Sequence, residues 1–373
     1  MKISVFQLLS LLCIMAIATH AQEVQPPLLN IGDPAPPLRV REWVKGTPIQ
    51  RFEKGRVYVL EFWATWCGPC IAAMPHLSAL AAEYKDKVTF IGIDIYEKKT
   101  TSIEKVKAFV DSIGHRMDYN VAIEDSNFME SDWFDASGVR GIPTSFVVNA
   151  QGRLAWIGHP KDLDSILPKI VNNTWDIKDA LSKRNLNKRL KELDDSLIYE
   201  LVRFRANPNK PGDLGKPDSA LLFIAEVIRN EPRLKYAPFI AFNTFSLLLK
   251  TNQHKAAYEY GKEVLVTPSY DEPAAGAIID VIDELSNKFN LLPEIYRLGA
   301  QAYQVRINQI PYPELVNIPR FYHQMAAWYW RANDKSKAVD AELKAIEALK
   351  IKKNVLAKDK AAYESQLEKY KRM

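Results

Sequence analysis

The segment FWATWCGPC, residues 62–70, decides both the fold and the chemistry expected of this chain. It overlaps the end of a nearly continuous apolar run, Val57 to Ala64, which predicts a strand buried on both faces. Apolar residues recur at helical spacing after Cys70, and Pro69 suits the first turn of a helix because it has no N–H group to lose. Cys67 is therefore expected at the N-terminus of a helix that follows a buried strand.

Two cysteines separated by two residues at a helix N-terminus indicate thiol–disulfide exchange. The thiolate is the attacking species, and the unpaired N–H groups of a helix N-terminus stabilise it. We predict that Cys67 is the nucleophile and that Cys70, one turn later, resolves the mixed disulfide. Half a zinc site, a copper site and a structural disulfide are the alternatives. The sequence has no second CxxC motif and no nucleotide fingerprint, so we expect neither a metal nor a cofactor.

The N-terminal residues 1–21 have the layout of a secretory signal peptide. A positive start is followed by the uncharged, mostly apolar run Val5 to Ala18 and by a small residue, Ala21, at a plausible cleavage site. The alternative is an uncleaved membrane anchor. Of the three cysteines, Cys13 would leave with the signal, so Cys67 and Cys70 would remain as one close pair. We expect an exported, periplasmic protein, anchored to the membrane if the signal stays in place.

The rest of the chain predicts two domains, as its 373 residues suggest. The proline-rich residues 22–37 should run extended, residues 38–172 alternate strand-like and helical patterns, and residues 176–373 are charged, amphipathic and helical throughout. The net charge of +5, with both signs mixed along the chain, gives no reason to expect a nucleic-acid partner.

Further strands and helices are predicted within residues 38–172. Val88 to Ile95 reads as a second buried strand, and residues 96–125 read as an inserted helix–strand unit in which Gly114 ends the helix. Two more strands, Thr144 to Val148 and Arg153 to Ile157, flank a turn and predict a hairpin. Residues 161–171 form the predicted closing helix. Together these elements predict an α/β domain with a central mixed sheet flanked by helices.

The segment 62–70 resembles the active-site segment of the thioredoxin superfamily, and three further features agree with that resemblance. Pro75 falls where the family has a proline in its active-site helix, and residues 141–144 (GIPT) resemble the family's cis-proline loop. Glu61, six residues before Cys67, stands where thioredoxins have a buried acid. The match covers roughly residues 31–172. Export, the opening GDPAP at 32–36 and the inserted unit resemble the TlpA/ResA-type branch.

The resemblance implies roles for particular residues. Glu61 would be the buried proton acceptor for Cys70, and Pro143 would hold the substrate backbone beside the disulfide, with a cis peptide bond before it. Trp66, Ile142 and Thr144 would contact the substrate. The acid is glutamate rather than aspartate, and the strand VTFIGID at 88–94 lacks the lysine that cytosolic thioredoxins carry near the acid.

The helical region contains two similar segments. Residues 249–260 (LKTNQHKAAYEY) and 331–342 (RANDKSKAVDAE) align when Asn252 is placed on Asn333, which places Ala257 on Ala338. This helix–turn–helix pattern resembles tetratricopeptide repeats, and an irregular helical bundle is the alternative. The aromatic run at 328–330 (WYW) predicts core packing, with a groove for a partner peptide as the other interpretation.

The functional prediction is an exported thiol–disulfide oxidoreductase that reduces disulfides of exported proteins. The resemblance implies a membrane-bound electron donor, and cytochrome maturation as one class of substrate. An oxidant or isomerase is the second hypothesis, because a CxxC motif alone does not set the direction of exchange. The third is an interaction protein whose helical region recruits a client or another protein partner. The sequence identifies neither the client nor the donor, nor the oligomeric state.

Overall fold

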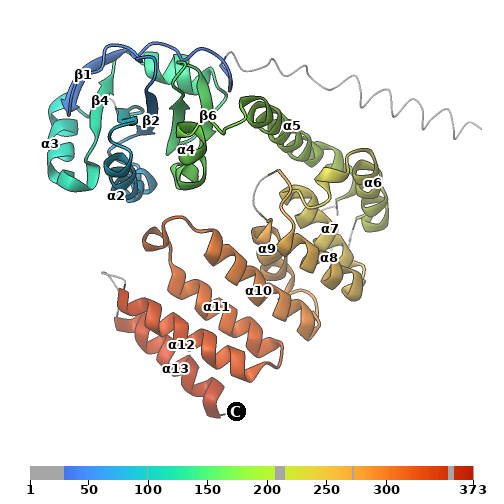
Figure 1. Ribbon diagram of the computed structural model, residues 1–373. Coiled ribbons are helices and arrows are strands. Elements are labelled where there is room, and N and C mark those ends of the chain that lie inside the picture. The colour runs from blue at the N-terminus through green and yellow to red at the C-terminus, as the bar shows by residue number, and fades with distance from the viewer. Residues whose placement is uncertain (1–28, 99, 206–214, 271–272, 352–356, 373) are drawn as a thin grey trace, which may run out of the picture. The chain divides into compact units, whose positions relative to one another are not determined.

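The computed structural model describes residues 29–98, 100–205, 215–270, 273–351 and 357–372. Within these ranges the chain divides into two compact units between Ile177 and Lys178 (Figure 1). The first unit carries the sheet, and the second is built from helices. The predicted signal peptide and residues 22–28 of the predicted extended segment lie outside the described residues. Among the described helices, none is long and apolar enough to cross a membrane.

The first unit is built on one six-stranded mixed sheet in the order β1-β4-β3-β2-β5-β6. The strands are β1 (Val40–Lys45), β2 (Val57–Trp63), β3 (Val88–Asp94), β4 (Asn120–Glu124), β5 (Thr144–Val148) and β6 (Leu154–Gly158). The neighbours β2, β3 and β4 run parallel, whereas β1, β5 and β6 pair antiparallel with theirs. Every residue of β2 is buried. The predicted strands and the hairpin are confirmed, and the sheet is mixed as expected.

The sequence did not predict β1 or the short π-helix η2 (Glu130–Asp135). β1 lies at the edge of the sheet, its residues are mostly half-buried, and its pairing with β4 has two register irregularities. An edge strand of this kind carries no clean alternation of apolar and polar residues, so its pattern gives a weak signal.

The helices of the first unit are α2 (Gly68–Glu83), α3 (Ile103–Ile113) and α4 (Leu163–Val171), with 3-10 turns η1 (Gly114–Met117) and η3 (Pro160–Asp162). In Figure 1, α2 and α4 lie below the labelled strands, and α3 lies at the left, beside β4. Trp63 on β2 stacks on Phe109 of α3. Its neighbour Phe62 contacts Trp133 and Phe134 of η2, as expected for alternate residues of a strand that point to opposite faces.

The described part of the predicted extended segment, from Leu29 onward, packs against the sheet. Leu29 and Ile31 are buried. The backbone N–H of Gly32 donates to the Leu154 carbonyl at 2.7 Å, and the N–H of Leu154 donates to the Asp33 carbonyl at 2.9 Å. Residues 29–33 therefore belong to the first unit and line the edge strand β6.

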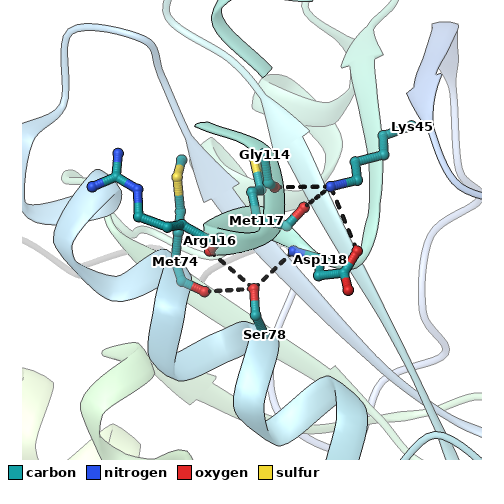
Figure 2. Close-up of polar contacts among 7 residues, drawn as sticks. All are labelled: Lys45, Met74, Ser78, Gly114, Arg116, Met117 and Asp118. Carbon is teal, nitrogen blue, oxygen red and sulfur yellow. Dashed lines mark hydrogen bonds and ion pairs between the residues drawn. The ribbon is translucent and has the colours of Figure 1, made fainter. Parts of the chain in front are cut away.

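A polar network joins the helix α2 to the inserted unit (Figure 2). The Ser78 hydroxyl lies 2.9 Å from the carbonyl oxygens of both Met74 and Arg116, and it accepts the N–H of Asp118 at 2.8 Å. Lys45 of β1 binds the same turn through two carbonyl oxygens and an ion pair of 3.6 Å with Asp118. The network fixes the middle of the helix that begins at the disulfide.

The second unit consists of helices joined by short connections. Its elements are α5 (Ile177–Leu201), η4 (Val202–Phe204), α6 (Pro217–Asn230), η5 (Pro232–Leu234), α7 (Pro238–Lys250), α8 (His254–Val266), α9 (Ala275–Leu285), α10 (Pro293–Gln309), η6 (Pro313–Leu315), α11 (Ile318–Arg331), α12 (Lys335–Ile351) and α13 (Ala357–Arg372). The predicted helical character of this region is confirmed.

The alignment of the two similar segments has a structural counterpart. Asn252 separates α7 from α8, Asn333 separates α11 from α12, and both asparagines have positive φ angles, 60° and 58°. Asparagine tolerates this left-handed conformation better than most residues. The aligned Ala257 and Ala338 are both fully buried. The two helix pairs therefore share a local design, and a tetratricopeptide architecture stays a prediction.

The aromatic residues of α11 belong to the core of the second unit. Trp328 and Tyr329 are buried in it, and Phe321, Tyr322 and Trp330 pack against it partly buried. The interpretation of these residues as core is confirmed.

Candidate active site

The two cysteines form a disulfide at the start of α2. The Cα atoms of Cys67 and Cys70 are 5.3 Å apart. Cys67 is the N-cap residue of the helix, and its Sγ accepts the backbone N–H of Cys70 at 3.2 Å. Pro69 occupies the first turn, where a missing N–H costs nothing. The predicted position of Cys67 at a helix N-terminus is confirmed, and the Cys70 N–H in the first turn of the helix donates to its sulfur.

The surroundings of the disulfide are asymmetric. Both cysteines are buried, whereas the adjacent Trp66 is half exposed. Its indole Nε1–H donates to the Tyr96 carbonyl at 2.9 Å, so the loop after β3 fixes the orientation of the ring. Trp63, three residues earlier, is buried in the core. Trp66 therefore offers a partly exposed apolar surface on the residue that precedes Cys67.

Glu61 lies inside the sheet on β2 and is almost completely buried. The hydroxyl of Ser145 on β5 donates to its Oε2, and its Oε1 has no hydrogen-bond partner among the described residues. Burial raises the pKa of Glu61 to about 8, and the hydrogen bond from Ser145 opposes part of that shift. A carboxyl group with a pKa near 8 can exchange a proton with a thiol near neutral pH.

The lysine of cytosolic thioredoxins has no counterpart on β3. The residue paired with Glu61 is Gly92. A side chain at Gly92 would crowd Met117, Tyr119 and Trp63, which approach to between 3.0 and 3.2 Å of where a Cβ would lie. The space beside Glu61 is thus filled by apolar and aromatic groups, and this environment favours the protonated form of the carboxyl group.

The loop before β5 lies at the same end of the central strands as the disulfide. β5 runs antiparallel to β2 and pairs its first residue, Thr144, with Phe62, so the loop before Thr144 adjoins the segment after Trp63. The peptide bond between Ile142 and Pro143 is cis, as predicted. Pro143 is buried and Ile142 is partly exposed. The hydroxyl of Thr144 is used inside the loop, where it donates to the Gly141 carbonyl at 2.7 Å.

Sequence reasoning missed two further carboxyl groups, Asp94 and Glu97, near the segment that carries Cys67. Asp94 ends β3 and is buried, and Glu97 follows in the next loop. The Glu97 Oε1 accepts the N–H of Thr65 at 2.6 Å, two residues before Cys67. An acidic residue at the end of an otherwise apolar strand was the available signal, but it does not show which loop the acid contacts.

A surface hollow of about 950 Å³ lies away from the disulfide. Its lining includes Arg56 and Thr89 near the starts of β2 and β3, whereas the disulfide follows the end of β2. Within the described part of the chain, no group of three or more histidine, cysteine or acidic side chains could hold a metal ion.

Comparison with known proteins agrees with this site. The family model Redoxin matches residues 31–171. Protein FixW of Rhizobium leguminosarum is 33% identical over 165 residues, which are 43% of this chain and 73% of FixW. Thiol-disulfide oxidoreductase ResA of Bacillus thuringiensis is 34% identical over 128 residues, 34% of this chain and 68% of that protein.

Thiol:disulfide interchange protein DsbE of Pasteurella multocida is 32% identical over 150 residues, 39% of this chain and 76% of that protein. The chain belongs to the redoxin family of thiol–disulfide oxidoreductases. Within this family it is related to the ResA and DsbE proteins, and its redox-active pair is Cys67 and Cys70. The redoxin match ends at residue 171, so the helical unit lies outside it.

Proposed function

We propose that this oxidoreductase reduces disulfides in exported proteins through a dithiol–disulfide cycle of Cys67 and Cys70. The observation that carries the proposal is the placement of Cys67 as the N-cap of α2, where its sulfur accepts a helix N–H. The same N–H and the helix dipole stabilise a thiolate at this atom. The sulfur of Cys70 does not accept this hydrogen bond, because the backbone N–H of Cys70 is itself the donor to Cys67.

The cycle begins with the reduced protein. The Cys67 thiolate attacks one sulfur of a substrate disulfide, which forms a mixed disulfide and releases the other substrate sulfur as a thiolate that takes up a proton. Cys70 then loses its proton and attacks the Cys67 sulfur. The second substrate thiol leaves, and the Cys67–Cys70 disulfide of the described structure is formed. Two electrons have passed to the substrate.

Glu61 is the proposed acceptor of the proton from Cys70. Its pKa near 8 lies close to that of an ordinary thiol, so a proton moves between the two groups at little cost. A carboxylate in water would be too weak a base for this step. The burial of β2 therefore gives Glu61 the basicity that the resolving step needs.

The substrate would lie between the loop at Pro143 and the exposed face of Trp66. An extended substrate backbone can pair with the backbone of this loop, and the partly exposed Ile142 and Trp66 offer apolar contacts to it. Thr144 shapes the loop through its bond to Gly141. We infer that recognition rests on the substrate backbone more than on particular side chains.

Recharging requires a dithiol donor that exchanges with the Cys67–Cys70 disulfide. For an exported protein this donor would be bound to the membrane, and the predicted signal peptide supports export. The reduction potential of the cysteine pair tests whether the protein acts as a reductant or an oxidant. The protein that comprises residues 22–373 is equilibrated in thiol buffers, and the state of the cysteine pair is read out by alkylation. We expect a value at or below about −250 mV. A value near about −120 mV would instead establish an oxidant.

The roles of the two cysteines have a separate test. Cys70→Ser should accumulate a mixed disulfide with a small protein disulfide, because the resolving thiol is missing. Cys67→Ser should accumulate none. Equal trapping by both variants would contradict the assignment of Cys67 as the nucleophile.

A further inference from the structure

A loop that follows β3 holds the active-site segment through three hydrogen bonds. The N–H of Ile95 donates to the Trp63 carbonyl at 2.9 Å, and the Trp66 indole donates to the Tyr96 carbonyl at 2.9 Å. The third bond joins the N–H of Thr65 to the Glu97 carboxylate at 2.6 Å. Trp63, Thr65 and Trp66 are therefore each hydrogen-bonded to one of residues 95–97. Only the bond between Thr65 and Glu97 depends on an ionisable side chain.

Glu97 is in turn held by Asp94. Asp94 is 2% exposed, and among the described residues no N–H or hydroxyl donor reaches its Oδ1 or the Oε2 of Glu97, which are both buried. Hydrogen bonding between the two carboxyl groups is one of the causes that raise the pKa of Asp94. Two carboxylates at hydrogen-bond distance cannot both be ionised, so one of them keeps a proton. Burial, together with the charge of Glu97, raises the pKa of Asp94 to about 9. The raised pKa of Asp94 favours a proton on Asp94, and the Glu97 Oε1 is the acceptor of the Thr65 amide.

We propose that Asp94 and Glu97 are positioning residues for thiol–disulfide exchange: one shared proton joins their carboxyl groups, and Glu97 thereby fixes the Thr65 amide two residues before Cys67. The proposal deepens the function proposed above, because it assumes that Cys67 is the attacking thiol. Neither carboxyl group reacts. Their effect is to hold the loop that carries Cys67 in one geometry at neutral pH.

The charged surroundings make this clamp sensitive to alkaline pH. The charges of Glu97, in the loop after β3, and of Glu124 on β4 raise the pKa of Asp94. Glu61 on β2 projects from the same face of the sheet as Asp94. On α3, Phe109 stacks on Trp63, the residue that pairs with Asp94 in the sheet. When Asp94 loses its proton, it gains a negative charge among carboxyl groups and no longer donates to Glu97. The two groups then repel, and the bond to Thr65 weakens.

The test uses the oxidised full-length protein, in which neither cysteine titrates. Threonine is labelled with ¹⁵N, and the Thr65 amide proton is followed by NMR between pH 7 and 10.5. We expect a downfield resonance that moves with a midpoint near the Asp94 pKa of about 9. Asp94→Asn should keep the downfield position and abolish the transition, because an amide donates to Glu97 at every pH.

The control variant is Asp111→Asn on the exposed side of α3, which should titrate like the unmodified protein. An upfield Thr65 resonance in the unmodified protein would overturn the proposal. So would a transition that Asp94→Asn leaves in place. A transition that instead follows Glu61 would disappear in Glu61→Gln, and this result also overturns the proposal.

Kinetics supply the second readout. At pH 7, Glu97→Ala should slow the reaction of reduced Cys67 with a small disulfide by about tenfold, the cost of one charge-assisted hydrogen bond. Glu97→Gln should restore most of the rate, because its amide oxygen can accept from Thr65 and its amide nitrogen can donate to Asp94. Equal loss in both variants would overturn the positioning role. If Cys67 is not the nucleophile, the NMR result still stands, so the two failures are distinguishable.

Discussion

Ser145 lies directly opposite Glu61 in the sheet, and its hydroxyl donates to the Glu61 carboxylate. The two residues are 84 positions apart in the chain, on β5 and β2. Residues paired across a sheet point to the same face, so strand register alone brings the hydroxyl to the acid. Ser145 itself is completely buried. The pair gives this domain a buried polar contact inside the sheet.

Replacing Ser145 with alanine should raise the pKa of Glu61 further. The hydrogen bond from Ser145 is the group that opposes the effect of burial. Without this hydrogen bond, the change in the rate of disulfide reduction that follows the titration of Glu61 should occur at a pH about one unit higher. The matched control is Ser137→Ala, which removes another buried hydroxyl, one that donates to the Phe134 carbonyl. An unshifted profile in Ser145→Ala would exclude Glu61 as the titrating group.

Glu61 should also make the oxidised protein less stable as pH rises. Its pKa is about 8 when folded and near 4.5 when unfolded, so the folded state binds the additional proton between these two values. Stability therefore falls through this window, by at most about 5 kcal/mol, and the loss is complete above pH 8. Glu61→Gln should be more stable than the unmodified protein at pH 8 and gain much less at pH 5. Hydrogen exchange in β2 and β3, compared at each pH, measures the difference.

Asp194 in α5 should be essential to the helical unit. Its buried carboxyl group accepts the N–H groups of Phe239 and Ile240 at 2.9 and 3.1 Å, at the start of α7, and the Tyr270 hydroxyl at 3.0 Å. Asp194→Ala would remove the acceptor of two N–H groups in the first turn of α7 and one acceptor of the Tyr270 hydroxyl, and should cost about 3 kcal/mol. The neighbouring Asp195→Ala removes only an exposed ion pair and should cost less than about 1 kcal/mol. Thermal unfolding followed by circular dichroism distinguishes the two, and equal losses would contradict this role.

Two helical glycines should respond in opposite directions to alanine. A Cβ at Gly299 in α10 would overlap the Trp328 ring, whereas a Cβ at Gly276 in α9 would meet nothing within 4 Å. Gly299→Ala should therefore destabilise the helical unit by about 2 kcal/mol through overpacking. Gly276→Ala should be neutral or stabilising by up to about 1 kcal/mol, since alanine favours helix. Chemical denaturation of both variants is the measurement. A stable Gly299→Ala protein would mean that Trp328 can move aside.

The candidate site was partly readable from local sequence. Cys67, Cys70 and Pro143 stand in short motifs, and Glu61 stands inside the apolar run Val57 to Ala64, which predicts a strand buried on both faces. The contact between Glu97 and the Thr65 amide could not be predicted, because the two residues are 32 positions apart in the chain and no spacing rule relates them. A pattern within one strand tells which residues face the core, but it does not tell which loop of another strand will meet them.

The sequence by itself determined the elements with strong periodicity: the buried strands β2 and β3, the helix that begins at the cysteines, the hairpin of β5 and β6, and the asparagine turns at Asn252 and Asn333. These depend on interactions between near neighbours in the chain. Tertiary structure alone decided the pairing of β1 with β4, the burial of Leu29 against the sheet and the partners of Glu61 and Glu97. Such contacts join distant residues, and they are selected by strand register and by the cost of leaving buried polar groups unpaired.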